Sequence, residues 1–556
     1  MALEIQFHAS RTAAAMPEPE SILPIQSNGE KQEKDKKKLA LLPLVFLIYF
    51  EVSGGPYGSE QTVQAGGPLL AILGFVIFPF VWSIPEALIT AELATALPGN
   101  GGFVLWTDRA FGPFPGSLMG SLKFLSGAIN AAAYPALCAD YMARAIPSIS
   151  SGAPRAVTVT ATTIILSFLN YTGLSVVGYT AMALCAASLS PFFLMAAAGL
   201  PKLHPRRWGA VASDRDWRLF FNTLFWNLNF WDNASTLAGE VDRPQRNFPR
   251  ALLAAGVLTS AAYLVPLLFG TAALDVPYSS WDSGFYADAA GMIAGHWLKY
   301  WIEVGAVLSA IGLYEAQLSS AAFQLLGMAD LGFLPKLFAL RSKWFDTPWV
   351  GIVTSSVISL GISFLTLDDI ISSANFLYSL GMLLEIASFL WLRRKEPRLK
   401  RPFRVPLRMP WLIFMCALPS VFLIYVMTLA SWRVLAISGG LTAFGCALYF
   451  AMELCKKKGC LMFDTLGEKA APSNGSHGET TPGGGGGFRL RRQQRGGGFR
   501  AIQTDRHLAG LIPAAGCAVV DPDGDNSCRR RRIQEEEDMS ISPGDIGGDN
   551  SGDSSL

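Results

Sequence analysis

Residues 39–65 read LALLPLVFLIYFEVSGGPYGSEQTVQA, an apolar segment whose middle, residues 53–58, is Ser-Gly-Gly-Pro-Tyr-Gly. Glycine and proline are the poorest helix formers, so this sequence predicts a helix that is broken halfway along its length. Residues 220–241, FFNTLFWNLNFWDNASTLAGEV, form a second apolar segment with a polar middle. Interrupted helices at matching places in two halves of a chain are typical of transporters built from inverted repeats, whose substrate lies at the breaks. A kink that serves packing alone is the alternative, but two at matching positions favour a binding site.

The composition around these two segments is that of a membrane protein. Of the 556 residues, 51% are hydrophobic and 16% are charged, and the mean hydropathy is +0.33. Soluble domains carry about a quarter charged residues, so the composition argues against a chain of soluble domains. The net charge of +2 does not indicate nucleic-acid binding. The eight cysteines show no zinc or disulfide spacing. The sequence contains no nucleophile–base or metal constellation, so neither an enzyme nor a metal or other cofactor is predicted.

A membrane-spanning helix needs about 20 mostly apolar residues. This criterion predicts an all-α membrane protein with about 12 transmembrane helices in a core at residues 39–455. The charged and glycine-rich ends, residues 1–38 and 456–556, are predicted to be disordered. The predicted spans are 39–65, 67–95, 114–144, 154–171, 174–199, 219–240, 250–273, 289–328, 348–366, 369–392, 407–430 and 432–454.

Basic residues in the short loops predict the orientation, because cytoplasmic loops are enriched in Lys and Arg. The lysine-rich start at 31–38 and the arginine-rich loop at 393–408 both place the two termini in the cytosol. The basic loop at 200–218 disagrees, because it is predicted to lie outside.

Ionisable residues within the predicted spans are mostly acidic. Such residues are costly in a membrane and usually functional. An acidic cavity with few bases suits an organic cation, with a proton as a possible coupled ion. We take Glu51, Asp232 and Glu315 as candidates for substrate contact and proton coupling. The acids are Glu51, Glu86, Glu92, Asp140, Asp232, Glu240, Glu303, Glu315 and Glu385, against one clear base, Lys123.

Aromatic residues accompany these acids and would suit a ligand with ammonium ends and an alkyl middle. Trp226 and Trp231 flank the second interruption, and Tyr134 and Tyr378 lie in the third and tenth predicted spans. Each candidate also has a structural alternative. The aromatic side chains could simply pack, Glu51 could bond the loosened backbone, and Asp232 could cap the second half of its helix.

Four acids receive no role from the sequence: Glu86, Asp140, Glu303 and Glu385. For Glu240, which lies beside Arg243 and Arg246 at the predicted cytosolic end, a structural or gating salt bridge is favoured over substrate contact. The same holds for Glu92.

Four short motifs together resemble the amino acid–polyamine–organocation superfamily over residues 39–455. They are VSGGPYG (52–58), LITAELATALPGNGGFVLW (88–106), AGEVDRPQRNFPRAL (238–252) and MADLGFLP (328–335). The longer strings around the two breaks are most similar to the plant polyamine uptake transporters, also called L-type amino acid transporter-like proteins. The resemblance implies a five-plus-five inverted repeat with two further helices and with broken helices 1 and 6, a LeuT-like fold.

Carried over by position, the resemblance places ligand-facing residues at Ser53, Gly54 and Gly55 in the first break, and at Trp226, Asn229 and Trp231 in the second. In relatives that take cationic amino acids an acid can stand at the position of Asn229. The amide here shifts charge recognition to Glu51, Asp232 or Glu315. A glutamate beside the first break would repel a substrate carboxylate, which favours a polyamine over an amino acid.

The resemblance implies proton-coupled uptake of putrescine, spermidine and spermine, and of the dication paraquat, at the plasma membrane. The expected partners are the polyamine, protons and the lipid bilayer, with no nucleic acid and no obligate protein partner. The alternatives are an amino-acid transporter of the same fold and a receptor or channel without coupled transport.

Overall fold

The computed structural model describes residues 38–364, 367–428 and 430–463, and these residues are almost entirely helical. The predicted disorder of the ends, 1–38 and 456–556, therefore falls outside the described residues apart from Lys38 and 456–463. Within 456–463 the prediction is wrong at its start, because the last helix continues to Lys458. The chain begins with α1 (Leu41–Val52), α2 (Glu60–Gly66), α3 (Pro68–Val81), α4 (Ser83–Ala96), α5 (Phe103–Phe111), α6 (Pro113–Ala145), α7 (Gly152–Tyr171) and α8 (Leu174–Gly199). It continues with α9 (Trp217–Leu228), α10 (Pro244–Ala273), α11 (Phe285–Ala294), α12 (His296–Asp330), α13 (Trp349–Ile362), α14 (Leu367–Lys395), α15 (Met409–Thr428) and α16 (Trp432–Lys458).

Each predicted span overlaps at least one of these helices, with ends that differ by up to six residues. Within the described residues, seven stretches are long and apolar enough to cross a membrane. They are Pro68–Ala96, Gly152–Tyr171, Leu174–Lys202, Pro244–Ala273, Ser372–Lys395, Met409–Thr428 and Trp432–Lys458. The apolar helices α1 and α13 are shorter. The structure thus establishes an all-helical protein with multiple apolar spans, and the full number of twelve stays a prediction.

Both predicted interruptions are present. Helix α1 ends at Val52, and Ser53 has an extended backbone before α2 begins at Glu60. Helix α9 ends at Leu228, and the chain resumes as a 3-10 helix, η5 (Asp232–Glu240). The second half of the sixth predicted span is therefore a tighter helix than an α-helix.

Two other predicted spans are divided, which the sequence analysis missed. The range 67–95 breaks at Trp82 between α3 and α4, close to Pro85, which has no N–H to donate to the preceding turn. The range 289–328 breaks at Gly295, whose φ of +98° is a conformation that glycine adopts without steric cost. Helix α12 starts only after this glycine.

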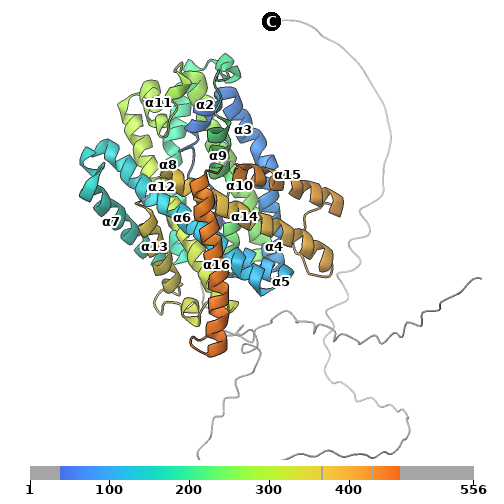
Figure 1. Ribbon diagram of the computed structural model, residues 1–556. Coiled ribbons are helices and arrows are strands. Elements are labelled where there is room, and N and C mark those ends of the chain that lie inside the picture. The colour runs from blue at the N-terminus through green and yellow to red at the C-terminus, as the bar shows by residue number, and fades with distance from the viewer. Residues whose placement is uncertain (1–37, 365–366, 429, 464–556) are drawn as a thin grey trace, which may run out of the picture. The chain divides into compact units, whose positions relative to one another are not determined.

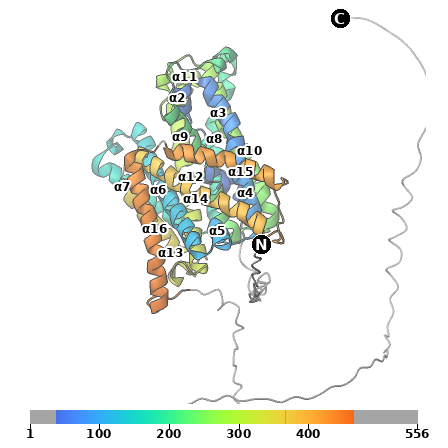
Figure 2. The same cartoon turned by 45° about the vertical axis from the view of Figure 1, so that its right-hand side comes forward.

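Helix α12 lies at the centre of the packing, in contact with α1, α6, α7, α8 and α13. Helix α16, orange in Figure 1, packs against α6 and α14, and α15 runs across the bundle beside α14 in Figure 2. The two broken segments meet at one end, where Leu39 N–H donates to Glu240 O at 2.8 Å and Leu39 O accepts from Asp242 N–H at 3.0 Å.

The basic loop at 200–218, which disagreed with the predicted orientation, uses part of its charge within the protein. Lys202 Nζ donates to Ile293 O at 2.8 Å. Arg207 donates to Ala272 O at 3.0 Å and pairs with Asp275 at 3.2 Å.

Candidate functional site

The first break is held open by hydrogen bonds from its own side chains and from α12. The Ser53 hydroxyl accepts from Gly55 N–H at 3.0 Å, and Ser309 Oγ on α12 donates to Gly54 O. Gly55 has a φ of +98°, in the region that favours glycine. A Cβ on Gly54 would collide with Ser309 Oγ and Leu313 Cδ1. The two glycines are therefore required by backbone conformation and by the close approach of α12.

This close approach predicts the effect of adding one methyl group. We expect Gly54→Ala to lower the free energy of unfolding by about 1–3 kcal/mol, the usual cost of overpacking, and to reduce substrate uptake in parallel. Gly127→Ala is the matched control, because no atom lies within 4 Å of the Cβ that it would add. Thermal unfolding of the purified variants measures the difference, and a Gly54→Ala variant as stable as the control would contradict this packing.

The carboxylate of Glu51 lies between the two broken segments and α12. Its Oε1 accepts from Asn233 Nδ2 in η5 at 2.9 Å and from Ser320 Oγ in α12 at 2.9 Å. Its backbone carbonyl accepts from Gln317 Nε2 at 3.2 Å. The side chain is 2% exposed. Both donors to the carboxylate are neutral groups. They satisfy its hydrogen bonding, but they supply no positive charge to balance its negative charge.

A network of polar side chains extends from Glu51 across α6 to the second broken helix. Gln317 donates to Tyr134 Oη at 3.1 Å and accepts from Asn130 Nδ2 at 2.8 Å. Asn130 in turn accepts from Trp226 Nε1 at 2.9 Å. The Trp226 ring also lies against Gly58 of the first break. The structure thus brings together Tyr134, Trp226 and Glu51, and adds Asn130 and Gln317, which the sequence analysis did not select.

Asp232 belongs to a second group, which we call the carboxylate cluster: Glu86 of α4, Lys123 of α6, Asp232 of η5, and Tyr378 and Glu385 of α14. Lys123 Nζ pairs with Asp232 Oδ2 at 2.6 Å and lies 3.6 Å from the centre of the Tyr378 ring. Tyr378 Oη lies 2.9 Å from Asp232 Oδ1 and also bonds Glu86. Asp232 therefore forms a buried ion pair and is not the N-cap of η5. The N-cap residue is Trp231, whose side chain makes no capping hydrogen bond.

Asn229 and Trp231 form their side-chain hydrogen bonds outside the network around Glu51. Asn229 Nδ2 lies 3.4 Å from Asn375 Oδ1 on α14, and Trp231 Nε1 donates to Leu228 O at 3.0 Å. The Trp231 ring lines a groove of about 630 Å³ between α3, α4 and α10 that has mostly apolar walls. A polyamine would find few charged partners there, so this groove is not the candidate site.

Glu315 also points elsewhere. Its Oε2 accepts from Asn170 Nδ2 of α7 at 3.1 Å, and its backbone carbonyl accepts from the same amide at 2.8 Å. The structure therefore separates the three predicted proton carriers into three places. Glu51 lies in the polar network, Asp232 in the carboxylate cluster, and Glu315 against α7.

Three further acids from the predicted spans form ion pairs. Glu240 Oε1 pairs with Arg341 Nη2 at 2.5 Å and accepts from Asn100 at 2.8 Å. The salt bridge expected for Glu240 exists, but its partner comes from the segment before α13 and not from the neighbouring Arg243 or Arg246. Asp140, which had no assigned role, pairs with Arg155 on α7.

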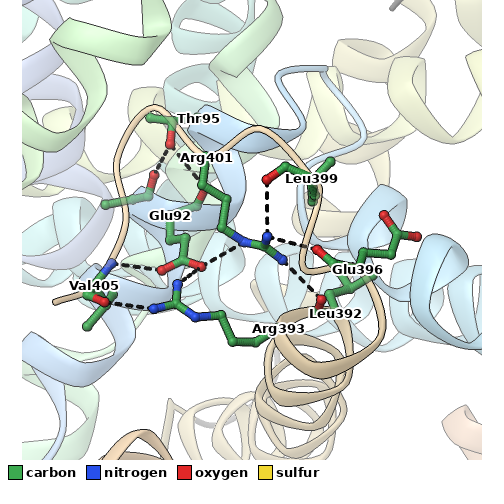
Figure 3. Close-up of polar contacts among 9 residues, drawn as sticks. Glu92, Thr95, Leu392, Arg393, Glu396, Leu399, Arg401 and Val405 are labelled. Carbon is green, nitrogen blue, oxygen red and sulfur yellow. Dashed lines mark hydrogen bonds and ion pairs between the residues drawn. The ribbon is translucent and has the colours of Figure 1, made fainter. Parts of the chain in front are cut away.

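Glu92 joins α4 to the loop after α14 (Figure 3). One of its oxygens pairs with Arg393 and, at 3.0 Å, with Arg401 Nε, and the other accepts from Val405 N–H at 2.8 Å. The Glu92 side chain is 0% exposed and both arginine side chains are 5% exposed. These contacts confirm the expected salt bridge.

Comparison with known proteins shows the family to which the chain belongs. Residues 39–451 match the amino acid permease family. A probable polyamine transporter of Arabidopsis thaliana is 47% identical over 84% of this chain and 97% of its own length. The polyamine transporter RMV1 of Arabidopsis thaliana is 45% identical over 77% of this chain and 88% of its own. For the polyamine transporter PUT1 of Oryza sativa subsp. japonica the identity is 45%, over 79% of this chain and 83% of the relative.

The family and its plant relatives confirm the predicted class of protein, a multi-pass membrane transporter and not an enzyme. The family match, residues 39–451, includes the four sequence motifs. The chain therefore belongs to the amino acid permease family, in the group that contains these plant polyamine transporters.

Proposed function

We propose that this protein takes up polyamines such as putrescine, spermidine and spermine by proton symport, with paraquat as a further substrate. Its fold would be the five-plus-five inverted repeat with twelve spans, in the plasma membrane with both termini cytosolic. The observation that carries the proposal is the buried Glu51 carboxylate at the first break, whose hydrogen-bond donors, Asn233 and Ser320, are neutral.

The surroundings of Glu51 suit an alkyl diamine. An ammonium group would supply the missing positive charge and further N–H donors to the carboxylate. The ring of Trp226, half-buried between the two breaks, offers an apolar face for a methylene chain and attracts cations. Tyr134, Asn130 and Gln317 provide oxygen acceptors for a second amine. The backbone of the two breaks is shaped by Ser53, Gly54, Gly55 and Asn229. Four further side chains would support the site from positions around this network: Trp231, Asp232, Glu315 and Tyr378.

The coupling step needs a buried carboxylate that is alternately protonated and free. Glu51, Asp232 and Glu315 remain the proposed carriers. In the proposed cycle, proton binding and docking of the polyamine permit the broken helices to rock against the rest of the bundle, which opens the site to the other side.

Uptake of labelled putrescine and spermidine tests this function in cells that lack their own carrier. We expect uptake to be faster at acidic than at neutral external pH, and to be lost when the proton gradient is collapsed. Spermine and paraquat should compete. Accumulation that persists without the gradient would contradict symport.

The amino acid permease family match keeps an amino-acid transporter as the second candidate. Competition separates the two, because an amino acid brings a carboxylate that Glu51 would repel. An excess of leucine or arginine that displaced labelled spermidine would favour the second candidate.

A further inference from the structure

The carboxylate cluster joins helices that belong to different parts of the bundle. Asp232 in η5 and Glu86 in α4 meet Lys123 in α6 and Glu385 in α14, and Tyr378 bonds both Asp232 and Glu86. All five side chains are buried, with Asp232, Tyr378 and Glu385 at 0% exposure, Glu86 at 1% and Lys123 at 2%. The Lys123 ammonium also lies 5.5 Å from the centre of the Phe103 ring in α5.

The charges in this cluster do not balance. Three carboxylates share this buried site with one ammonium group, and Asp232 pairs with it at 2.6 Å. Glu385 lies beside Asp232 and interacts electrostatically with Lys123 and Glu86, and no N–H or O–H group among the described residues donates to its oxygens or to Glu86 Oε2. Like charges that share a buried site cannot all remain ionised, because each destabilises the others without water to screen them. Such a site therefore holds one or more protons.

The cluster is also bonded to the backbone of the second break. Phe230 N–H donates to Tyr378 Oη at 2.9 Å, and Asp232 N–H donates to Glu86 Oε1 at 3.2 Å. Phe230 has a φ of +69°, a strained conformation for a bulky residue. Asn233, the next residue after Asp232, bonds the Glu51 carboxylate. Protonation of the cluster would thus alter the bonds that hold the break next to the proposed substrate site.

We propose that the carboxylate cluster is the binding site of the transported proton, with Glu86 and Glu385 as the carboxylates that exchange it and Lys123 as a fixed counter-charge. The proposal rests on the proposed symport and assigns the proton exchange to two carboxylates beside Asp232, which is one of the carriers named there. A proton from the outside converts one carboxylate to a carboxylic acid, and its release to the inside restores the carboxylate. The titratable and charged groups that face this site are those of the cluster itself. Glu51 is connected to the cluster through Asn233, which follows Asp232 in the chain and donates to the Glu51 carboxylate.

The test uses the full-length protein in proteoliposomes and the double variant Glu86→Gln/Glu385→Gln. This variant leaves the Lys123–Asp232 pair neutral, so no excess negative charge remains to bind a proton. We expect spermidine accumulation driven by an imposed pH gradient to fall about tenfold or more, while exchange of labelled for unlabelled spermidine at equal pH stays within about twofold of the parent. Exchange requires no net proton movement and therefore reports that the variant is folded.

Asp140→Asn is the control, because Asp140 also lies on α6 but forms a half-exposed pair with Arg155; both readouts should be unchanged. A double variant that still accumulates spermidine with the parent's pH dependence would overturn the proposal, whereas a parent that transports no spermidine would refute the proposed function instead. If the double variant also loses spermidine exchange, a second measurement decides between the outcomes. Spermidine is added to the purified protein in weak buffer, and the pH change that reports proton uptake or release is recorded. The proposal requires a pH change with the parent and none with the variant, and equal changes would refute it.

Discussion

Glu51→Gln is expected to abolish most polyamine uptake, with a loss of about 100-fold at low substrate concentration. The substitution keeps the size of the side chain and an oxygen that can accept from Asn233 and Ser320. It removes the negative charge that would bind an ammonium group. A charge-assisted hydrogen bond in a buried site contributes about 1.5–3 kcal/mol, so the expected loss lies near the upper end of this range. Initial rates of labelled spermidine uptake, corrected for the amount of protein at the membrane, measure it.

The control for Glu51→Gln is Glu303→Gln, which removes a buried carboxylate from a part of α12 outside the polar network. It should leave uptake within about twofold of the parent. If Glu51→Gln transported spermidine at the parental rate, the carboxylate at the first break would not be a substrate contact.

Glu92→Ala is expected to lower the free energy of unfolding by about 3–5 kcal/mol. Removing this carboxylate leaves two buried guanidinium groups, Arg393 and Arg401, without the counter-charge that both contact, and breaking a buried ion pair on one side costs this much. The Val405 N–H would also lose its acceptor. Thermal unfolding of the purified protein in detergent measures the change, together with the amount of folded protein recovered.

Arg109→Ala gives the matched comparison for Glu92→Ala. Arg109 of α5 pairs at 2.9 Å with Glu396, which begins the loop after α14, but the Arg109 side chain is 41% exposed. An exposed pair of this kind contributes about 0–1 kcal/mol. Equal destabilisation by the two substitutions would show that burial does not determine the strength of the Glu92 contacts.

The local features of the fold were predictable because short sequences determine them. The Ser-Gly-Gly-Pro segment at 53–56 cannot continue a helix, and the structure breaks there. The break at Gly295 was missed because the apolar pattern continues across it. A single glycine in an apolar segment, such as Gly295 in 289–328, can either lie within a helix or end it, and the sequence alone does not distinguish the two.

The candidate site was less predictable, because it depends on which face of a helix meets which neighbour. In GLYEAQLSS, Glu315 was chosen for its charge. Helical geometry places Glu315 and Ser319 on one face, toward α7, and Gln317 and Ser320 on another, toward the first break. The sequence did contain one indication of the face that meets the first break, namely the polar residue Gln317 two positions after Glu315.

Long-range pairing could not be read from the sequence at all. Lys123 was recognised as the one clear base within the spans, but its partner Asp232 lies 109 positions away along the chain. Glu240 has two arginines nearby in sequence and pairs with neither, because Arg341 approaches it from another segment. Packing, and not sequence distance, selects these partners.

The central claim is that a carboxylate sheltered at the first helix break binds a positively charged substrate. A structure of the purified protein determined with bound spermidine tests it most directly. The account predicts density for an ammonium group within hydrogen-bond distance of the Glu51 carboxylate, between the two broken segments and beside Trp226. Spermidine bound at a place with no acidic side chain, with Glu51 still bonded only to Asn233 and Ser320, would contradict it.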